Sequence, residues 1–107
     1  MLVFTLKKHW FEKIKSGEKS VEYREVKPYW TKRLNPKSGL GSIFLKLLEA
    51  KGGEFCNIPC KLRLGYTNKY MTASVVKIEI VDGNNTDLHI NKPVYAFYLK
   101  NIKEVEQ

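Results

Sequence analysis

The last three predicted strands of this chain follow one another without a helix between them. They span Cys60 to Tyr66, Met71 to Val81, and Val94 to Leu99, the last continuing towards Val105. Apolar residues recur along each run, and Asp82-Gly83-Asn84-Asn85 supplies the turn after the second run. Consecutive strands of this kind argue against an all-parallel sheet and favour a small mixed barrel.

The first part of the chain changes its hydrophobic period twice. Residues 2–7 are rich in β-branched and aromatic side chains and predict a strand. From His9 to Ser16 the apolar residues take helical spacing, which predicts a short amphipathic helix, and Gly17 ends it as a left-handed residue. Lys19 to Val26 then alternate between apolar and charged residues, which predicts a half-buried strand.

Two further helices are predicted in the middle of the chain. Lys27-Pro28 begin a second short helix, with proline in the first turn, where its missing N–H does no harm. Asn35 to Gly41 contain proline, serine and glycine and predict a loop. Ser42 caps a third helix, Ser42 to Ala50, which Gly52-Gly53 close, although an extended Ile43-Phe44-Leu45 stays open.

These elements predict an α+β protein, a small mixed β-barrel of about five strands with two to three short helices. A length of 107 residues suits one domain, 1–107, which buries a hydrophobic core. Hydrophobic residues make up 43% of the chain and charged residues 28%, which excludes a disordered protein. The sequence contains no internal repeat.

The chain is strongly basic. Nineteen Lys and Arg against eleven Asp and Glu give a net charge of +8, which favours a polyanionic partner, nucleic acid first. Most of these residues are lysines, so a role in solubility alone is the alternative. No apolar run approaches the roughly 20 residues that cross a bilayer, and Met1 to Lys8 place apolar residues before charges, the reverse of a secretory signal. We therefore expect a cytoplasmic protein without membrane contact.

The two cysteines indicate neither a disulfide framework nor a metal centre. Cys56 and Cys60 have C-x3-C spacing, unlike a redox motif or a zinc knuckle, and we expect two reduced thiols in or near a loop. A metal site would need His9 or His89 to converge with them. We expect no metal and no cofactor.

The densest polar motif is Gly17-x-Lys19-x-x-Glu22-x-Arg24. Gly17 lets the chain leave the helix sharply, Lys19 lies at the mouth of the turn, and Glu22 and Arg24 project from one face of the next strand, opposite the apolar Val21. Three charged groups are thus expected to meet beside a helix end. The alternative is a surface strand whose Glu and Arg simply pair, worth about 0–1 kcal/mol.

The run from Leu6 to Arg24 resembles the ASCH domain, a PUA-like β-barrel family whose signature G-x-K-x-x-E-x-R follows a strand and a helix. Tyr29-Trp30-x-x-Arg33-Leu34 is similar to the Y-W-x-x-R-L of small bacterial and phage members, and Leu64-Gly65-Tyr66 resembles their N-G-Y strand end. The chain departs from the family pattern at Leu99-Lys100-Asn101-Ile102, where the family has L-G-x-I.

This resemblance implies a cleft beside the signature residues that binds RNA or modified nucleosides. In the acetylcytidine amidohydrolase branch of the family, a threonine nucleophile stands where this chain has Glu22, and Lys19 matches its activating lysine. Because an acyl-glutamate would be an anhydride, deacetylation by that route is disfavoured. Glu22 could instead act as a general base on a 2′-hydroxyl, with Lys19 or Arg24 stabilising the phosphorane, so an enzyme acting on RNA or modified nucleosides is the alternative function.

Binding is the more direct prediction, since basic side chains neutralise phosphates and aromatic faces stack on unpaired bases. Trp30, Trp10, Phe11, Tyr95 and Phe97 are expected to be core residues. A module that holds an acidic protein partner is a third, weaker hypothesis. The predicted RNA- or nucleotide-binding residues are Lys8, Lys19, Glu22, Arg24, Tyr29, Arg33 and Tyr66. In the enzyme alternative, Lys19 and Glu22 are the catalytic pair.

Overall fold

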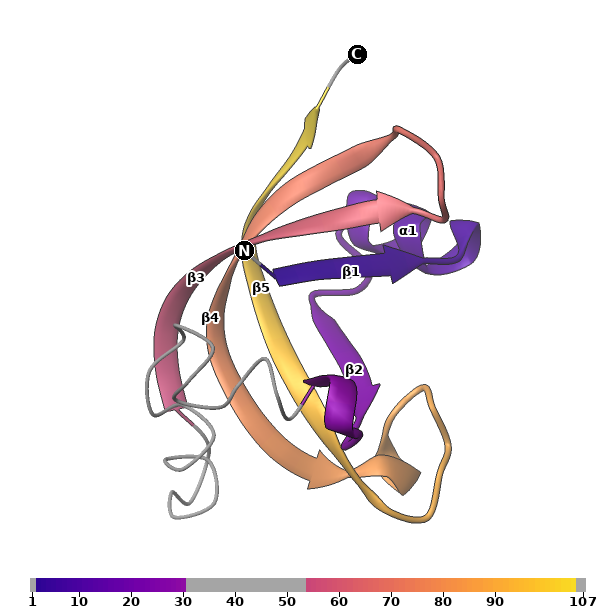
Figure 1. Cartoon of the computed structure of the whole chain (residues 1–107), viewed down its shortest axis with the longest axis vertical. Helices are drawn as coiled ribbons and strands as arrows, with labels where there is room; N and C mark the ends of the chain where they lie inside the picture. The colour runs from indigo at the N-terminus through magenta and orange to yellow at the C-terminus, as the bar shows by residue number, and fades with distance from the viewer. Residues whose placement is uncertain (1, 31–53, 106–107) are drawn as a thin grey trace. The chain divides into compact units, whose positions relative to one another are not determined.

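The computed structural model describes residues 2–30 and 54–105, with residues 54–56 in their backbone alone. Five strands form one sheet in the order β1-β3-β4-β5-β2 (Figure 1). Residues 28–30 are helical. The elements are β1 (Leu2–Leu6), α1 (Lys8–Lys15), β2 (Val21–Glu25), β3 (Glu54–Leu64), β4 (Tyr70–Asp82), the 3-10 helix η2 (Gly83–Asn85) and β5 (Pro93–Val105).

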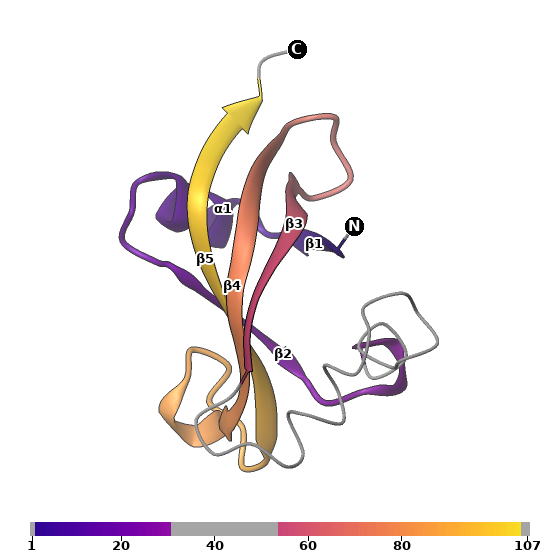
Figure 2. The same cartoon turned by 90° about the vertical axis from the view of Figure 1, so that its left-hand side faces the viewer.

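The sheet is mixed. Strand β1 runs parallel to β3, with Leu2 opposite Cys60 and Leu6 opposite Leu64. Strands β3 and β4 are joined by residues 65–69, the β3–β4 turn, which is too short for a parallel crossover and makes this pair antiparallel. Figure 2 shows β4 between β3 and β5, as the strand order requires. The predicted α+β class with about five strands is confirmed.

Contacts divide the chain into two compact units. The first contains residues 1–22, 57–76 and 98–107, and the second contains residues 23–56 and 77–97. Strands β2 to β5 contribute residues to both. The single-domain assignment stays a prediction.

The core of the first unit follows from alternation along its strands. Every second residue of β1 is buried, as is typical of a strand with one covered face. Helix α1 contacts β1 and buries Phe11 and Ile14, and Gly17 follows it at φ +87°, the left-handed conformation that the sequence predicts. The buried hydrophobic side chains described in this unit are Leu2, Phe4, Leu6, Phe11, Ile14, Ile58, Cys60, Leu62, Met71, Ala73, Val75 and Leu99.

The second unit has an aromatic core. Trp30 lies 5.5 Å from Phe97 between ring centroids, and Phe97 lies 6.2 Å from Tyr95, all three buried, so their core assignment is confirmed. The loop after β4 is held by hydrogen bonds: the Gly83 N–H donates to the Lys92 carbonyl at 2.9 Å. The buried Thr86 hydroxyl donates to the Gly83 carbonyl and accepts from the Leu88 N–H.

Strand β3 corrects two predictions. It begins at Glu54 rather than Cys60 and ends at Leu64 rather than Tyr66, so Cys56, expected in or near a loop, lies within the strand together with Cys60. Pro59 lies inside this strand, where the prediction stops because proline has no N–H to donate. The described register with β1 places Leu2 opposite Cys60, the residue directly after Pro59.

Two predictions lie outside the described residues: the loop from Asn35 to Gly41 and the helix from Ser42 to Ala50. Within residues 2–30 and 54–105, no helix has the length and hydropathy to span a membrane.

Candidate functional site

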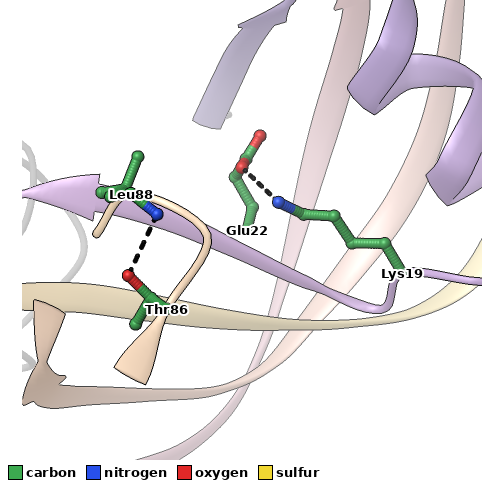
Figure 3. A network of polar contacts seen from close by, with 4 residues as sticks. All are labelled: Lys19, Glu22, Thr86 and Leu88. Carbon is green, nitrogen blue, oxygen red and sulfur yellow. Dashed lines mark hydrogen bonds and ion pairs between the residues drawn. The ribbon is translucent and has the colours of Figure 1, made fainter. Parts of the chain in front are cut away.

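The signature motif places a buried ion pair in the first unit. The Lys19 Nζ lies 3.5 Å from Glu22 Oε1, and the two side chains are only 10% and 6% exposed (Figure 3). The turn after α1 sets this geometry: the Gly17 N–H donates to the Ile14 carbonyl, and the Lys19 N–H donates to the Lys13 carbonyl at 3.1 Å. Glu22 then follows as the second residue of β2.

The depth at which Glu22 is buried does not follow from hydropathy. Alternation assigned Glu22 to the face opposite Val21, the expected buried side, yet Glu22 is 5% exposed while Val21 is only half-buried. A prediction from hydropathy places every carboxylate on the solvent-exposed side of a strand. An ionised carboxylate is nevertheless tolerated inside a protein when a cation lies beside it. Lys19 supplies that cation.

The Trp10 ring organises the cations beside this pair. The Lys19 Nζ lies 4.4 Å from the ring centroid, and the Lys13 Nζ lies 5.8 Å from it. The His9 ring meets the indole edge-on, 4.6 Å between centroids and 67° between planes. Trp10 is half-buried rather than the core residue that the sequence predicts, because its π-face receives ammonium groups.

A shallow hollow of about 620 Å³ lies along the outer side of α1. Its lining includes Lys8, a predicted binding residue, together with Lys13, which the sequence reasoning missed. Because Lys13 lies three residues after Trp10 on one helix, their proximity could have been predicted from helical spacing. The complete lining is Lys8, His9, Glu12, Lys13, Ser16 and Glu18.

Arg24 and Tyr29 form a second group, within the second unit. The Arg24 Cζ lies 5.6 Å from the centroid of the buried Trp30 ring, and the Tyr29 ring meets that ring edge-on at 5.1 Å. Tyr29 is 53% exposed, so one side of its ring faces solvent. The structure therefore distributes the predicted residues over two aromatic–cation groups, one around Trp10 and one around Trp30.

The remaining two predicted residues are Tyr66 and Arg33. Tyr66 belongs to the β3–β4 turn and is 90% exposed. Arg33 lies outside the described residues.

Neither a metal nor a reactive thiol is indicated in the part of the chain that the structure describes. No three or more His, Cys, Asp or Glu side chains among residues 2–30 and 54–105 are arranged to hold a metal ion. Burial raises the pKa of the Cys60 thiol to about 11, although a hydrogen bond with the Ala73 backbone opposes this. Cys60 is therefore protonated at neutral pH and is a poor nucleophile.

No family model matches the chain, and neither the curated proteins nor the solved structures contain a significant match to it.

Proposed function

We propose that this protein is a small ASCH-type, PUA-like barrel that binds single-stranded RNA or a nucleotide beside the Lys19–Glu22 ion pair. The resemblance of the signature motif suggests the family, and the mixed α+β sheet is compatible with it. The observation that carries the functional proposal is the burial of both charged side chains of this pair, with the Lys19 ammonium against the Trp10 ring.

A buried ion pair contributes little to the stability of a fold, because desolvation of the two charges offsets most of their attraction. An apolar pair of similar size would stabilise the fold about as well. Charged groups held in a low-dielectric setting are instead common where a ligand is recognised. The Glu22 carboxylate accepts hydrogen bonds and the Lys19 ammonium donates them. Side by side, they complement a base edge that presents a donor next to an acceptor.

The surroundings of the pair suit a nucleotide. The half-buried Trp10 offers an aromatic surface for stacking, and Lys8 and Lys13 line the adjacent hollow as candidate phosphate contacts. Arg24, Tyr29, Arg33 and Tyr66 enter the proposal through the family resemblance. The expected cytoplasmic location is compatible with an RNA ligand.

The proposal is tested by fluorescence anisotropy of a labelled single-stranded RNA. Lys19→Gln should weaken binding by about 10-fold or more, since hydrogen bonds to charged groups are worth about 1.5–3 kcal/mol. Lys77→Gln is the matched control: Lys77 also lies 3.5 Å from a glutamate, Glu79, and the substitution removes the same charge. The RNA affinity of this control should fall by no more than about 4-fold, the loss expected for one phosphate contact at about 0.15 M salt.

Equal losses of RNA affinity in the Lys19 and Lys77 variants would show that only the overall charge matters, and would refute the site. Circular dichroism establishes that each variant is folded. If Lys19→Gln fails to fold, Trp10→Leu tests the same site, because it removes the stacking surface while leaving both charges. An unchanged affinity in that variant would also refute the proposal.

The enzyme alternative draws on one observation, the carboxylate and ammonium 3.5 Å apart in a water-poor setting. A general base and a phosphate-stabilising cation at this separation are the minimum for cleavage at a 2′-hydroxyl. Gel analysis of the same RNA after incubation tests this function. Cleavage that is lost in Glu22→Gln while binding stays within a few-fold supports the enzyme, and equal cleavage by both proteins indicates contamination.

A further inference from the structure

A second cationic site lies on the other face of the sheet in the first unit. The buried face of β1 and β3 carries Leu2, Phe4 and Leu62, whereas Val3 pairs in register with Lys61 on the face that is not buried. A pocket of about 250 Å³ opens on this face. Its lining is Val3, Lys61, Arg63, Thr67, Asn68 and Tyr70, and we call it the basic pocket.

The charge of the basic pocket is not balanced by acidic neighbours. Lys61 and Arg63 lie two residues apart on β3 and therefore point to the same face. Neither forms a salt bridge with any other described residue, and the sequence contains no Asp or Glu from residue 55 to residue 78. The Lys61 Nζ lies 4.3 Å from the Tyr70 ring centroid, which holds the ammonium at the pocket.

The β3–β4 turn beside the pocket is well ordered by hydrogen bonds. The Gly65 N–H donates to the Leu6 carbonyl at 2.8 Å, which ties the turn to the end of β1, and Gly65 has φ +55°. The Thr67 hydroxyl donates to the Leu64 carbonyl at 2.6 Å. The turn therefore presents Tyr66, 90% exposed, from a fixed backbone.

We propose that the basic pocket binds a backbone phosphate of single-stranded RNA and that Tyr66 stacks on a base of the same strand. Two half-buried cations that form no ion pair with a described acidic side chain attract an anion, and the Asn68 amide offers a further hydrogen-bond donor. An exposed aromatic residue on the same turn that lines a cationic pocket is the combination that favours single-stranded nucleic acid over an acidic peptide. The choice of RNA rests on the proposed function, but the pocket shares no lining residue with the site around Trp10.

Anisotropy titrations with a labelled oligouridine at several salt concentrations test this site. The double variant K61Q/R63Q should bind about 14-fold more weakly at about 0.15 M salt, and the slope of log affinity against log salt should fall by about 1.4. The double variant K100Q/K103Q is the control, because it removes two exposed cations of β5 and leaves the same net charge. Its affinity and slope should change less than those of K61Q/R63Q.

Tyr66→Ala separates stacking from charge. It should weaken binding by about 5-fold or more without a change in the salt slope, whereas Tyr66→Phe should restore wild-type affinity. Tyr66 is exposed, so neither substitution threatens the fold.

The two proposals fail in different ways. If K61Q/R63Q binds like its control while Lys19→Gln loses affinity, the basic pocket is refuted and the proposed function stands. If K61Q/R63Q loses affinity and Lys19→Gln does not, the site at Trp10 is refuted and the pocket stands. Losses of equal size in K61Q/R63Q and K100Q/K103Q would also refute the pocket, because they would reflect net charge alone.

Discussion

Removing one charge of the buried Lys19–Glu22 pair should destabilise the protein far more than removing both. At 3.5 Å and an effective dielectric constant of about 20, the attraction between two unit charges is about 5 kcal/mol. Desolvation offsets most of that gain, so replacing both residues with apolar side chains of similar volume should be close to neutral. Breaking the pair from one side should cost about 3–5 kcal/mol.

The two single variants should differ in a defined order. Lys19→Met removes the ion pair together with the ammonium 4.4 Å from the Trp10 centroid, and this cation–π contact adds about 0.5–2 kcal/mol. Glu22→Met removes the ion pair but leaves the Lys19 cation over the indole. We therefore expect Lys19→Met to be the more destabilising substitution.

A double-mutant cycle compares Lys19→Met, Glu22→Met and the variant that carries both substitutions. Urea unfolding followed by far-UV circular dichroism measures the free energy of unfolding of each protein. Single-variant costs of about 3–5 kcal/mol each and a nearly neutral double variant correspond to a coupling energy of about 6–10 kcal/mol, above the roughly 0.5–3 kcal/mol usual for residues in contact. Lys77 and Glu79, also 3.5 Å apart but 25% and 16% exposed, provide a control cycle whose coupling should be smaller because water screens the charges. Additive effects at Lys19 and Glu22, within about 0.5 kcal/mol, would refute the reasoning.

Three further measurements test the structure. In a Cys56→Ser background, the free energy of unfolding measured with urea should fall between about pH 9 and 11, because the Cys60 thiol ionises at a lower pH in the unfolded chain than in the folded protein. Cys60→Ala in the same background should remove this fall. Hydrogen bonding to Lys92 lowers the pKa of Glu25, so its stabilisation should be present above pH 4.5 and lost as pH falls through the folded-state pKa, and Lys92→Gln should raise that pKa in an NMR titration. A Cβ at Gly83 would lie 2.5 Å from the Lys92 carbonyl oxygen, so Gly83→Ala should cost about 1–3 kcal/mol in thermal unfolding, whereas an unchanged midpoint would exclude this close approach.

The local elements were predictable where one physical signal dominates. The helix before Gly17 combines a 3.6-residue period with a glycine at φ +87°, and the structure follows both. The start of β3 was not predictable, because Pro59 resembles a strand breaker in sequence. The pairing of β3 with β1, which places Leu2 opposite Cys60, joins segments almost 60 residues apart and leaves no local signal in the sequence.

In the candidate site, too, some features could be predicted from the sequence and others could not. Lys19 and Glu22 are three residues apart, directly after the turn at Gly17, so their proximity could be predicted from local geometry. The inward orientation of Glu22 could not, because a hydrophobic period assigns a carboxylate to solvent and carries no information on its counter-charge. The basic pocket was missed for a different reason: Val3 and Lys61 become neighbours only through the sheet register.

The two proposed RNA contacts lie on different sides of β1, the strand at one end of the sheet order. Helix α1 contacts β1 on its apolar side, while Val3 and the basic pocket lie on the opposite face. A short ligand therefore occupies only one site, whereas a strand that passes around this edge engages both and gains affinity through effective concentration. Oligouridines longer than a threshold within about 4–16 nucleotides should bind more tightly in the wild type, and this gain should disappear in K61Q/R63Q. A gain with length that persists in that variant would show that the strand follows another path.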